Sequence, residues 1–127
     1  MSVLIVDDET ESVEELVEAL ELRGMIAHGT SRPEDAVDRV LADPEIDSVV
    51  VDVRMPRIGG GELIRRLRAA LSGTRPMRYY IASGHAHCAD LELGDVGFTV
   101  DGFFAKPIDV NALAAALGAA DKRVSLS

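Results

Sequence analysis

Hydrophobic residues along this chain occur in two patterns, short continuous runs and longer stretches with helical spacing. Val3 to Val6 form one continuous run, and Ile46 to Val53 contain another. Runs of this length are typical of strands that are buried on both faces, as in a parallel sheet. Weaker runs at residues 25–30, 77–82 and 103–105 predict three further strands.

Between the predicted strands, apolar residues recur three or four positions apart, which is the spacing of an amphipathic helix. Val13 to Leu20 follow this spacing, with glutamates filling the other face, and Arg23-Gly24 is a typical helix end. Ser31 and Glu34 form a capping-box pattern ahead of a second helix, which Asp43-Pro44 should stop.

A third helix is predicted after a run of glycines. Residues 59–61 are all glycine and indicate a flexible loop, and Leu63, Leu67 and Leu71 then recur every fourth position. Val110 to Ala120 predict an alanine-rich terminal helix. Residues 85–102 fit a fourth helix poorly, because each of their glycines at 94 and 97 costs a helix about 1 kcal/mol relative to alanine.

The alternation of strands and helices predicts an α/β fold, with an open, doubly wound parallel sheet and helices on both of its faces. We expect one domain over residues 1–120, an atypical fourth helix, and a C-terminal tail at residues 121–127.

Composition narrows the class of protein. The chain has 127 residues, of which 47% are hydrophobic and 28% charged, as expected for one folded domain. The 13 basic and 22 acidic residues give a net charge of −9, which argues against nucleic acid or an anionic membrane as a partner. A single cysteine, Cys88, and the lack of an apolar run near 18 residues predict a cytoplasmic location.

Polar residues follow the predicted strands at their carboxyl ends, where ligands bind in open α/β sheets. Asp7-Asp8 follow the first strand, Asp52 the third, Ser83-Gly84 the fourth and Lys106-Pro107 the fifth. We therefore expect three carboxylates, one hydroxyl and one ammonium group to converge on one edge of the sheet.

Three neighbouring carboxylates resist joint ionisation, since two unit charges about 4 Å apart repel by roughly 4 kcal/mol at an effective dielectric of 20. Mg²⁺ suits a site of a few carboxylates that also receives phosphate oxygens. A carboxylate beside Mg²⁺ and a lysine is a plausible phosphoryl acceptor.

With these motifs the chain resembles the receiver domains of two-component response regulators, of the stand-alone type. The resemblance rests on Asp7-Asp8, Asp52-Val53-Arg54-Met55-Pro56, Ser83-Gly84 and Lys106-Pro107, and it covers nearly the whole chain. It implies the flavodoxin-like strand order 2-1-3-4-5.

The resemblance also implies a role for each residue. Asp52 would accept a phosphoryl group from a sensor histidine kinase, a histidine phosphotransfer protein or a small phosphodonor. Asp7 and Asp8 would hold Mg²⁺ together with Asp52 and the backbone carbonyl of Arg54, and Lys106 would pair with the phosphoryl group.

Two further residues would report the modification. Ser83 resembles the hydroxyl that moves toward the phosphoryl group, and Phe103 the aromatic residue that turns inward with it. The chain would act on no separate substrate and would only phosphorylate and dephosphorylate itself. With no effector domain after the last helix, output would be contact with a downstream protein or a phosphorelay.

Each residue also has a structural explanation. Asp7 and Asp8 could cap the first helix, and Asp52 or Ser83-Gly84 could be turn residues. Lys106 could be a solvated charge and Phe103 a core residue.

Other functions fit less well. His85-Ala86-His87-Cys88 suggests a zinc site, but a second ligand cluster is missing and His28 is isolated. An FMN carrier of the same fold would not place Asp7-Asp8-Glu9 where a phosphate binds. An aspartate-nucleophile phosphohydrolase would separate its two aspartates by one residue. Within the family, the alternative is a degenerate receiver that binds proteins constitutively without phosphorylation.

Overall fold

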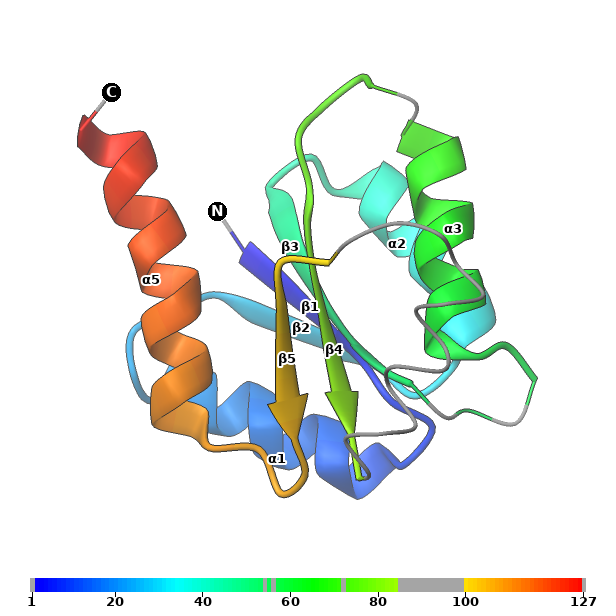
Figure 1. The fold of residues 1–127 in the computed structure, drawn as a ribbon, viewed down its shortest axis with the longest axis horizontal. Coiled ribbons are helices and arrows are strands. Elements are labelled where there is room, and N and C mark those ends of the chain that lie inside the picture. Colours follow the sequence, from blue (N-terminus) through cyan, green and yellow to red (C-terminus); the bar gives the residue numbers. More distant parts are fainter. Residues whose placement is uncertain (1, 54, 56, 72, 85–99, 127) are drawn as a thin grey trace.

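The computed structural model describes residues 2–53, 55, 57–71, 73–84 and 100–126, with only the course of the helix for residues 119–126. Its centre is a five-stranded parallel sheet in the order β2-β1-β3-β4-β5 (Figure 1). The predicted α/β class and the strand order implied by the resemblance are therefore confirmed.

All five strands lie where the apolar runs predict them, within one or two residues at each end. The long central strands are buried almost throughout, which explains why their sequences lack the polar alternation of a half-exposed strand. The strands are β1 (Ser2–Val6), β2 (Ala27–Thr30), β3 (Ile46–Asp52), β4 (Arg78–Ser83) and β5 (Gly102–Ala105).

Helices cover both faces of the sheet and divide the core in two. On one face Leu20 of α1 and Leu113 of α5 pack with Val50, and on the other Leu63 and Leu67 of α3 pack with residues of α2, β1 and β3. The helices are α1 (Thr10–Glu21), α2 (Ala36–Ala42), α3 (Gly60–Leu71) and α5 (Val110–Leu126), with a 3₁₀ turn η1 (Pro33–Asp35) ahead of α2. No helix in the described ranges combines the length and the apolar character that crossing a bilayer would need.

The capping box predicted at Ser31 and Glu34 is wrong. Arg32 is the N-cap of η1 and Asp35 that of α2, and neither makes a side-chain capping hydrogen bond. The Glu34 carboxylate instead contacts Arg57, which lies 23 residues further along the chain. The end of this helix before Asp43 is as predicted.

The prediction of a flexible glycine loop at residues 59–61 is also wrong in part. Gly60 and Gly61 are buried and form the first turn of α3, and Gly59 accepts a hydrogen bond from the Leu63 N–H. A Cβ atom on Gly60 would lie 2.6 Å from the backbone oxygen of Asp52. Close packing against the end of β3, rather than flexibility, explains glycine at this position.

The terminal helix α5 runs to Leu126, beyond the end predicted at Ala120, so residues 121–126 continue the helix. The prediction of an irregular fourth helix concerns residues 85–102, most of which lie outside the described residues.

Candidate functional site

Three carboxylates meet at the carboxyl edge of the sheet. Asp7 and Asp8 directly follow β1, and Asp52 ends the neighbouring strand β3. Because parallel strands end at the same edge, one oxygen from each carboxylate lies within 4.8 Å of the other two. The predicted convergence of these residues is therefore present.

Lys106 supplies the counter-charge within this cluster. Its Nζ donates a hydrogen bond to Asp7 Oδ2 at 2.7 Å and lies 3.3 Å from Asp52 Oδ2. Asp7 and Asp52 are only 6% and 8% exposed, so neither of these charges is fully hydrated. One ammonium among three carboxylates leaves the site with an excess of negative charge.

The chain fixes Lys106 through the neighbouring strand. Its backbone N–H donates to the carbonyl oxygen of Ser83 at 2.8 Å, which ties the segment after β5 to the end of β4. Ser83 is itself 5% exposed, and the preceding residue, Ala82, pairs with Asp52 in the sheet register. The predicted hydroxyl therefore ends the strand adjacent to the one that carries Asp52.

Asp7 is held from two sides. Its Oδ1 accepts a hydrogen bond from the Glu9 N–H at 3.1 Å, and its own N–H donates to the Thr30 carbonyl at 3.3 Å. The N-cap of α1 is Glu9, which makes no side-chain capping bond. The capping explanation of Asp7 and Asp8 therefore does not account for this geometry.

Charge and burial shift two pKa values in the cluster. Loss of water around the carboxyl raises the pKa of Asp8, and the hydrogen bond and charge of Asp7 raise it further. Burial by itself would lower the pKa of Lys106, but its hydrogen bond to Asp7 and the charges of Asp52 and Asp7 outweigh burial and raise it. The shift of Lys106 and part of the shift of Asp8 therefore reflect the negative charge that surrounds them.

We expect Asp8→Asn to stabilise the metal-free protein at pH 7. The raised pKa of Asp8 means that the folded chain binds this proton more tightly than the unfolded chain, whose value is near 3.8. The ionised Asp8 carboxylate therefore lowers the stability of the wild type at pH 7, and this loss disappears as the pH falls through the folded-state pKa toward 3.8. The stability advantage of Asp8→Asn over the wild type should shrink over the same pH range. Urea unfolding between pH 7 and pH 4 measures this difference.

The matched control is the same substitution in an Asp7→Asn background, where the advantage should be smaller because Asp7 is one of the causes of the shift. If Asp8→Asn were less stable than the wild type at pH 7, the ionised Asp8 carboxylate would not be destabilising, and the prediction would be contradicted.

Of the remaining predicted site residues, the structure describes Phe103 but not Arg54 or residues 85–88. Phe103 lies on β5 opposite Ile81 and is 47% exposed, so the explanation that it is a core residue is wrong. Arg54, predicted to offer its carbonyl oxygen, lies outside the described residues, as does the 85–88 segment with its histidines and cysteine.

Sequence reasoning missed the cavity beside the cluster. It measures about 330 Å³, has Asp7, Asp52 and Lys106 along its wall, and extends between α1 and α5 over apolar residues such as Leu16 and Val50. It also missed Gly60, whose N–H donates to the Val53 carbonyl at 3.1 Å and so fixes the chain just after Asp52. The glycine run was a visible signal, but close packing and flexibility leave the same sequence pattern.

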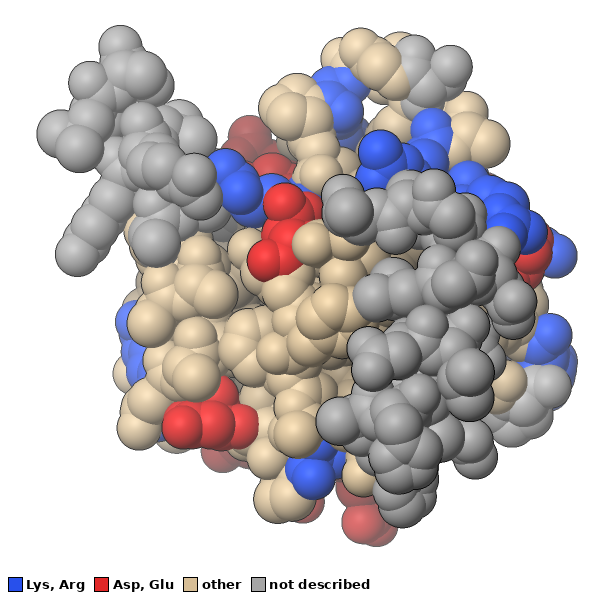
Figure 2. Space-filling view, viewed as in Figure 1, with Lys and Arg blue, Asp and Glu red and all other residues tan. Residues whose placement is uncertain are grey.

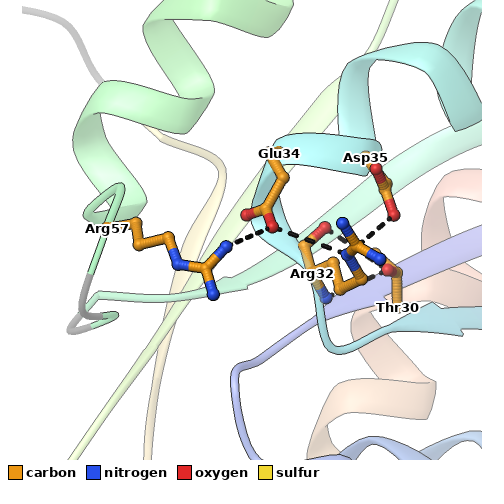
Figure 3. Close-up of polar contacts among 5 residues, drawn as sticks. All are labelled: Thr30, Arg32, Glu34, Asp35 and Arg57. Atoms are coloured by element: carbon orange, nitrogen blue, oxygen red, sulfur yellow. Dashed lines mark hydrogen bonds and ion pairs between the residues drawn. The ribbon is translucent and has the colours of Figure 1, made fainter.

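A second polar cluster joins two loops near the same edge (Figure 3). Glu34 Oε1 accepts a hydrogen bond from Arg57 Nη1 at 2.8 Å, and Arg32 Nε lies 3.5 Å from the same oxygen and 3.4 Å from Asp35 Oδ2. A backbone hydrogen bond lowers the pKa of Glu34, and the charges of Arg57 and Arg32 add to this against the effect of burial. The cluster connects the segment before α2 to the loop that follows Asp52.

The carboxylate cluster fits Mg²⁺ on its own chemistry. Hard divalent cations prefer oxygen ligands, and Mg²⁺ is commonly held by one or two carboxylates while retaining water or phosphate oxygens. Asp8 is exposed while Asp7 and Asp52 are buried, so the cluster combines fixed ligands with an open side.

Comparison with known proteins points to a single family. A family model described as response regulator receiver domain matches residues 3–118. The two-component response regulator PprB of Pseudomonas aeruginosa is 34% identical over 84 residues, or 66% of this chain, and the matched part makes up 30% of that protein.

Solved structures agree with this match. A response regulator receiver protein from Pseudomonas putida superimposes with a TM-score of 0.78 at 28% identity, covering 91% of this chain and 93% of that one. A receiver domain from Methylobacillus flagellatus gives 0.80 at 27% identity, covering 94% and 97%.

Proposed function

The chain belongs to the response regulator receiver domain family of two-component signalling, and on this basis we propose that it is a switch operated by phosphorylation of Asp52. The observation that carries the proposal is the contact of a single lysine, Lys106, with both Asp7 and Asp52 inside a cluster of three carboxylates. Separate structural explanations would otherwise be needed for four residues, Asp7, Asp8, Asp52 and Lys106, that meet at one point.

In the proposed reaction, a carboxylate oxygen of Asp52 attacks the phosphorus atom of the donor. The bond from phosphorus to the donor's nitrogen breaks, and the nitrogen leaves with the electron pair and takes up a proton. Lys106 already lies 3.3 Å from Asp52, so its ammonium can pair with phosphoryl oxygens with little movement.

Asp7, Asp8 and Asp52 would hold Mg²⁺, with the carbonyl of Arg54 as a further ligand by family resemblance. When bound, the ion neutralises the charge that collects on the phosphoryl oxygens. Ser83 would then bind a phosphoryl oxygen, and Phe103, now half exposed, would turn inward and change the surface near β5.

The phosphoryl donor would be a sensor histidine kinase or a histidine phosphotransfer protein, and the output a contact with a downstream protein or a further transfer. The chain itself would catalyse only its own phosphorylation and dephosphorylation. It spans about 30% of the length of PprB, so the output of that whole protein does not carry over. A cytoplasmic location stays a prediction.

The proposal is tested by incubating the purified chain with Mg²⁺ and phosphoramidate and recording the intact mass. We expect a gain of one phosphoryl group, which a chelator present from the start should prevent because the carboxylate cluster would then stay uncompensated. A chain that gains no mass at any Mg²⁺ concentration would instead be a degenerate receiver that binds its partner constitutively.

A further inference from the structure

A small pocket lies beside the start of β4, at the opposite edge of the sheet from the carboxylate cluster. It measures about 210 Å³ and is formed by α3, by the loop that follows α3 and by β4, with the lining residues Arg68, Leu71, Gly73, Arg75, Met77 and Tyr79. The carboxylate cluster lies at the carboxyl ends of the strands. The pocket is therefore separate from the candidate phosphorylation site, and the proposed function does not use it.

The polar side chains that line the pocket all carry hydrogen-bond donors. They are the guanidinium groups of Arg68 and Arg75 and the hydroxyl group of Tyr79, and no acidic side chain joins them among the described residues. Figure 2 shows basic side chains gathered near the top of the view, where Figure 1 places the end of α3 and the start of β4. Donors and positive charge without a carboxylate favour a negatively charged ligand.

Tyr79 brings a hydroxyl group that has no partner. The residue is only 4% exposed, and its backbone N–H donates to the Asp101 carboxylate at 2.8 Å. Its hydroxyl group makes no hydrogen bond to any residue that the structure describes, yet its oxygen is not fully enclosed. A buried tyrosine hydroxyl usually has a partner, because an unpaired polar group in the interior costs free energy. The hydroxyl group of Tyr79 is therefore open to a ligand in the pocket.

The hydroxyl group also keeps its proton at neutral pH. Burial raises the pKa of Tyr79 above its ordinary value of 10.0. The positive charges of Arg68 and Arg75 act to lower this pKa without reversing the shift, so both guanidinium groups are near enough to influence the hydroxyl group. Arg68 also lies over the Tyr79 ring, 5.6 Å from its centre. Tyr79 can therefore act as a hydrogen-bond donor in a positively charged environment.

Arg75 supplies a fixed positive charge. Its Nη2 donates to three carbonyl oxygens between the end of α2 and the start of β3, those of Val40 at 2.7 Å, Asp43 at 3.2 Å and Ile46 at 3.1 Å. Its Nε is enclosed without a partner, and its Nη1 makes no hydrogen bond within the described ranges and is not enclosed. No carboxylate in that part of the chain pairs with Arg75. The guanidinium group is thus held in place and still has an N–H group to offer.

We propose that this pocket binds a small tetrahedral oxyanion, such as phosphate or sulfate, between the Tyr79 hydroxyl group and the Arg75 guanidinium group. The donors belong to different elements and surround the pocket, which suits an ion with oxygens on every side. The volume argues against a nucleotide or another large anion, since pockets for ligands of that size measure roughly 300–1,000 Å³. Arg68 adds its charge, and the site does not require Arg68 to lack other partners.

The bound ion would connect several parts of the fold. Arg75 already holds the end of α2 and the start of β3, and the ion would join this group to Tyr79 on β4. A ligand that binds only the folded chain stabilises it. We therefore expect phosphate to raise the urea concentration at which the chain unfolds.

The experiment is a titration of the isotope-labelled chain with sodium phosphate, followed by NMR at constant ionic strength and without Mg²⁺. We expect the amide signals of residues 73–79 to shift and to saturate, with a Kd on the order of 1 mM. Sulfate should compete with phosphate, because it has the same shape and a similar charge. Without Mg²⁺ or a phosphoryl donor the measurement does not depend on the proposed function.

Tyr79→Phe removes the hydroxyl group and keeps the ring beneath Arg68. Affinity for phosphate should fall about tenfold, as expected for the loss of one hydrogen bond to a charged group. The matched control is Tyr80→Phe, which removes the same group from the next residue of β4, on the other face of the sheet, and should leave the affinity unchanged.

Arg75→Lys keeps the positive charge but loses the planar set of donors, so it should weaken binding as well. Tyr79→Phe leaves Arg75 and its three carbonyl contacts in place, and it carries the test if Arg75→Lys does not fold. Shifts that rise without saturating, or that sodium chloride reproduces, would overturn the proposal. So would a Tyr79→Phe chain that binds phosphate like the wild type, or a Tyr80→Phe chain that loses as much affinity. Acetate that binds as tightly as phosphate would overturn the assignment to a tetrahedral ion.

Discussion

Asp52→Asn is expected to reduce phosphoryl incorporation from phosphoramidate by at least about 100-fold, a conservative bound for the loss of a nucleophile. The substitution keeps the shape of the side chain and removes the anionic oxygen that would attack phosphorus. Asp7 and Asp8 remain as carboxylates, but Asp7 Oδ2 already accepts the hydrogen bond from Lys106 Nζ. Intact mass measured over time in the presence of Mg²⁺ gives the rate for both proteins.

The control for this prediction is Asp47→Asn. Asp47 lies on the same strand, at the opposite end from Asp52, so the change in charge and chemistry is identical but the distance from the cluster is the length of β3. We expect this variant to be phosphorylated at the wild-type rate. An adduct that survives Asp52→Asn would show that another residue is the acceptor and would contradict the proposed role of Asp52.

The layers of the fold could be predicted because buried positions are occupied by apolar residues, whose spacing can be read from the sequence. The run at Val49 to Val51 has no polar residue because both faces of β3 are covered, and the spacing of Leu63, Leu67 and Leu71 places one side of α3 on the sheet. The convergence of Asp7 and Asp52 followed from topology, since they lie at the carboxyl ends of the adjacent parallel strands β1 and β3. Lys106 follows β5, which is separated from β3 by β4, and its long side chain spans that distance to both carboxylates.

Predictions of local structure were wrong where residues distant in the sequence determine the contacts. Glu34 has the position of a capping residue, but its carboxylate accepts a hydrogen bond from Arg57. No local sequence pattern encodes a contact between residues 23 positions apart. The sequence also does not tell which side of a strand faces solvent at the edge of a sheet. Phe103 is apolar and lies on a strand, yet its side chain is half exposed on the edge strand β5.

Net charge alone does not show where the charges lie, for a similar reason. A sum over 127 residues cannot show that acidic residues collect on α1 and arginines on α3, because the sum discards position. The topology then places these two helices on opposite sides of the sheet, which turns a pattern along the chain into a separation of charge in space. Arguments about partners from net charge therefore hold only after the charges have been placed on elements.

Gly60→Ala is expected to destabilise the protein by about 2 kcal/mol, in the range found for overpacking of a filled site. The added Cβ would lie 2.6 Å from the Asp52 oxygen and 3.0 Å from the Val53 Cα. Both are backbone atoms of the segment that ends β3, so neither can move aside as a flexible side chain would. Urea unfolding measures the loss, and the rate of phosphorylation should fall as well, because any relief of the contact shifts the backbone of Asp52.

Gly118→Ala separates this effect from the general consequences of replacing glycine in a helix. Gly118 lies within α5, and a Cβ there would meet nothing within 4 Å. Alanine favours the helix by up to about 1 kcal/mol, so the control should be stabilised. The same gain acts in part on Gly60→Ala, and the clash has to exceed it for the sign to reverse. If both variants were equally stabilised, the contact of Gly60 with the end of β3 would not constrain the position of Asp52, and the glycine run would be no more than the flexible loop that its sequence suggests.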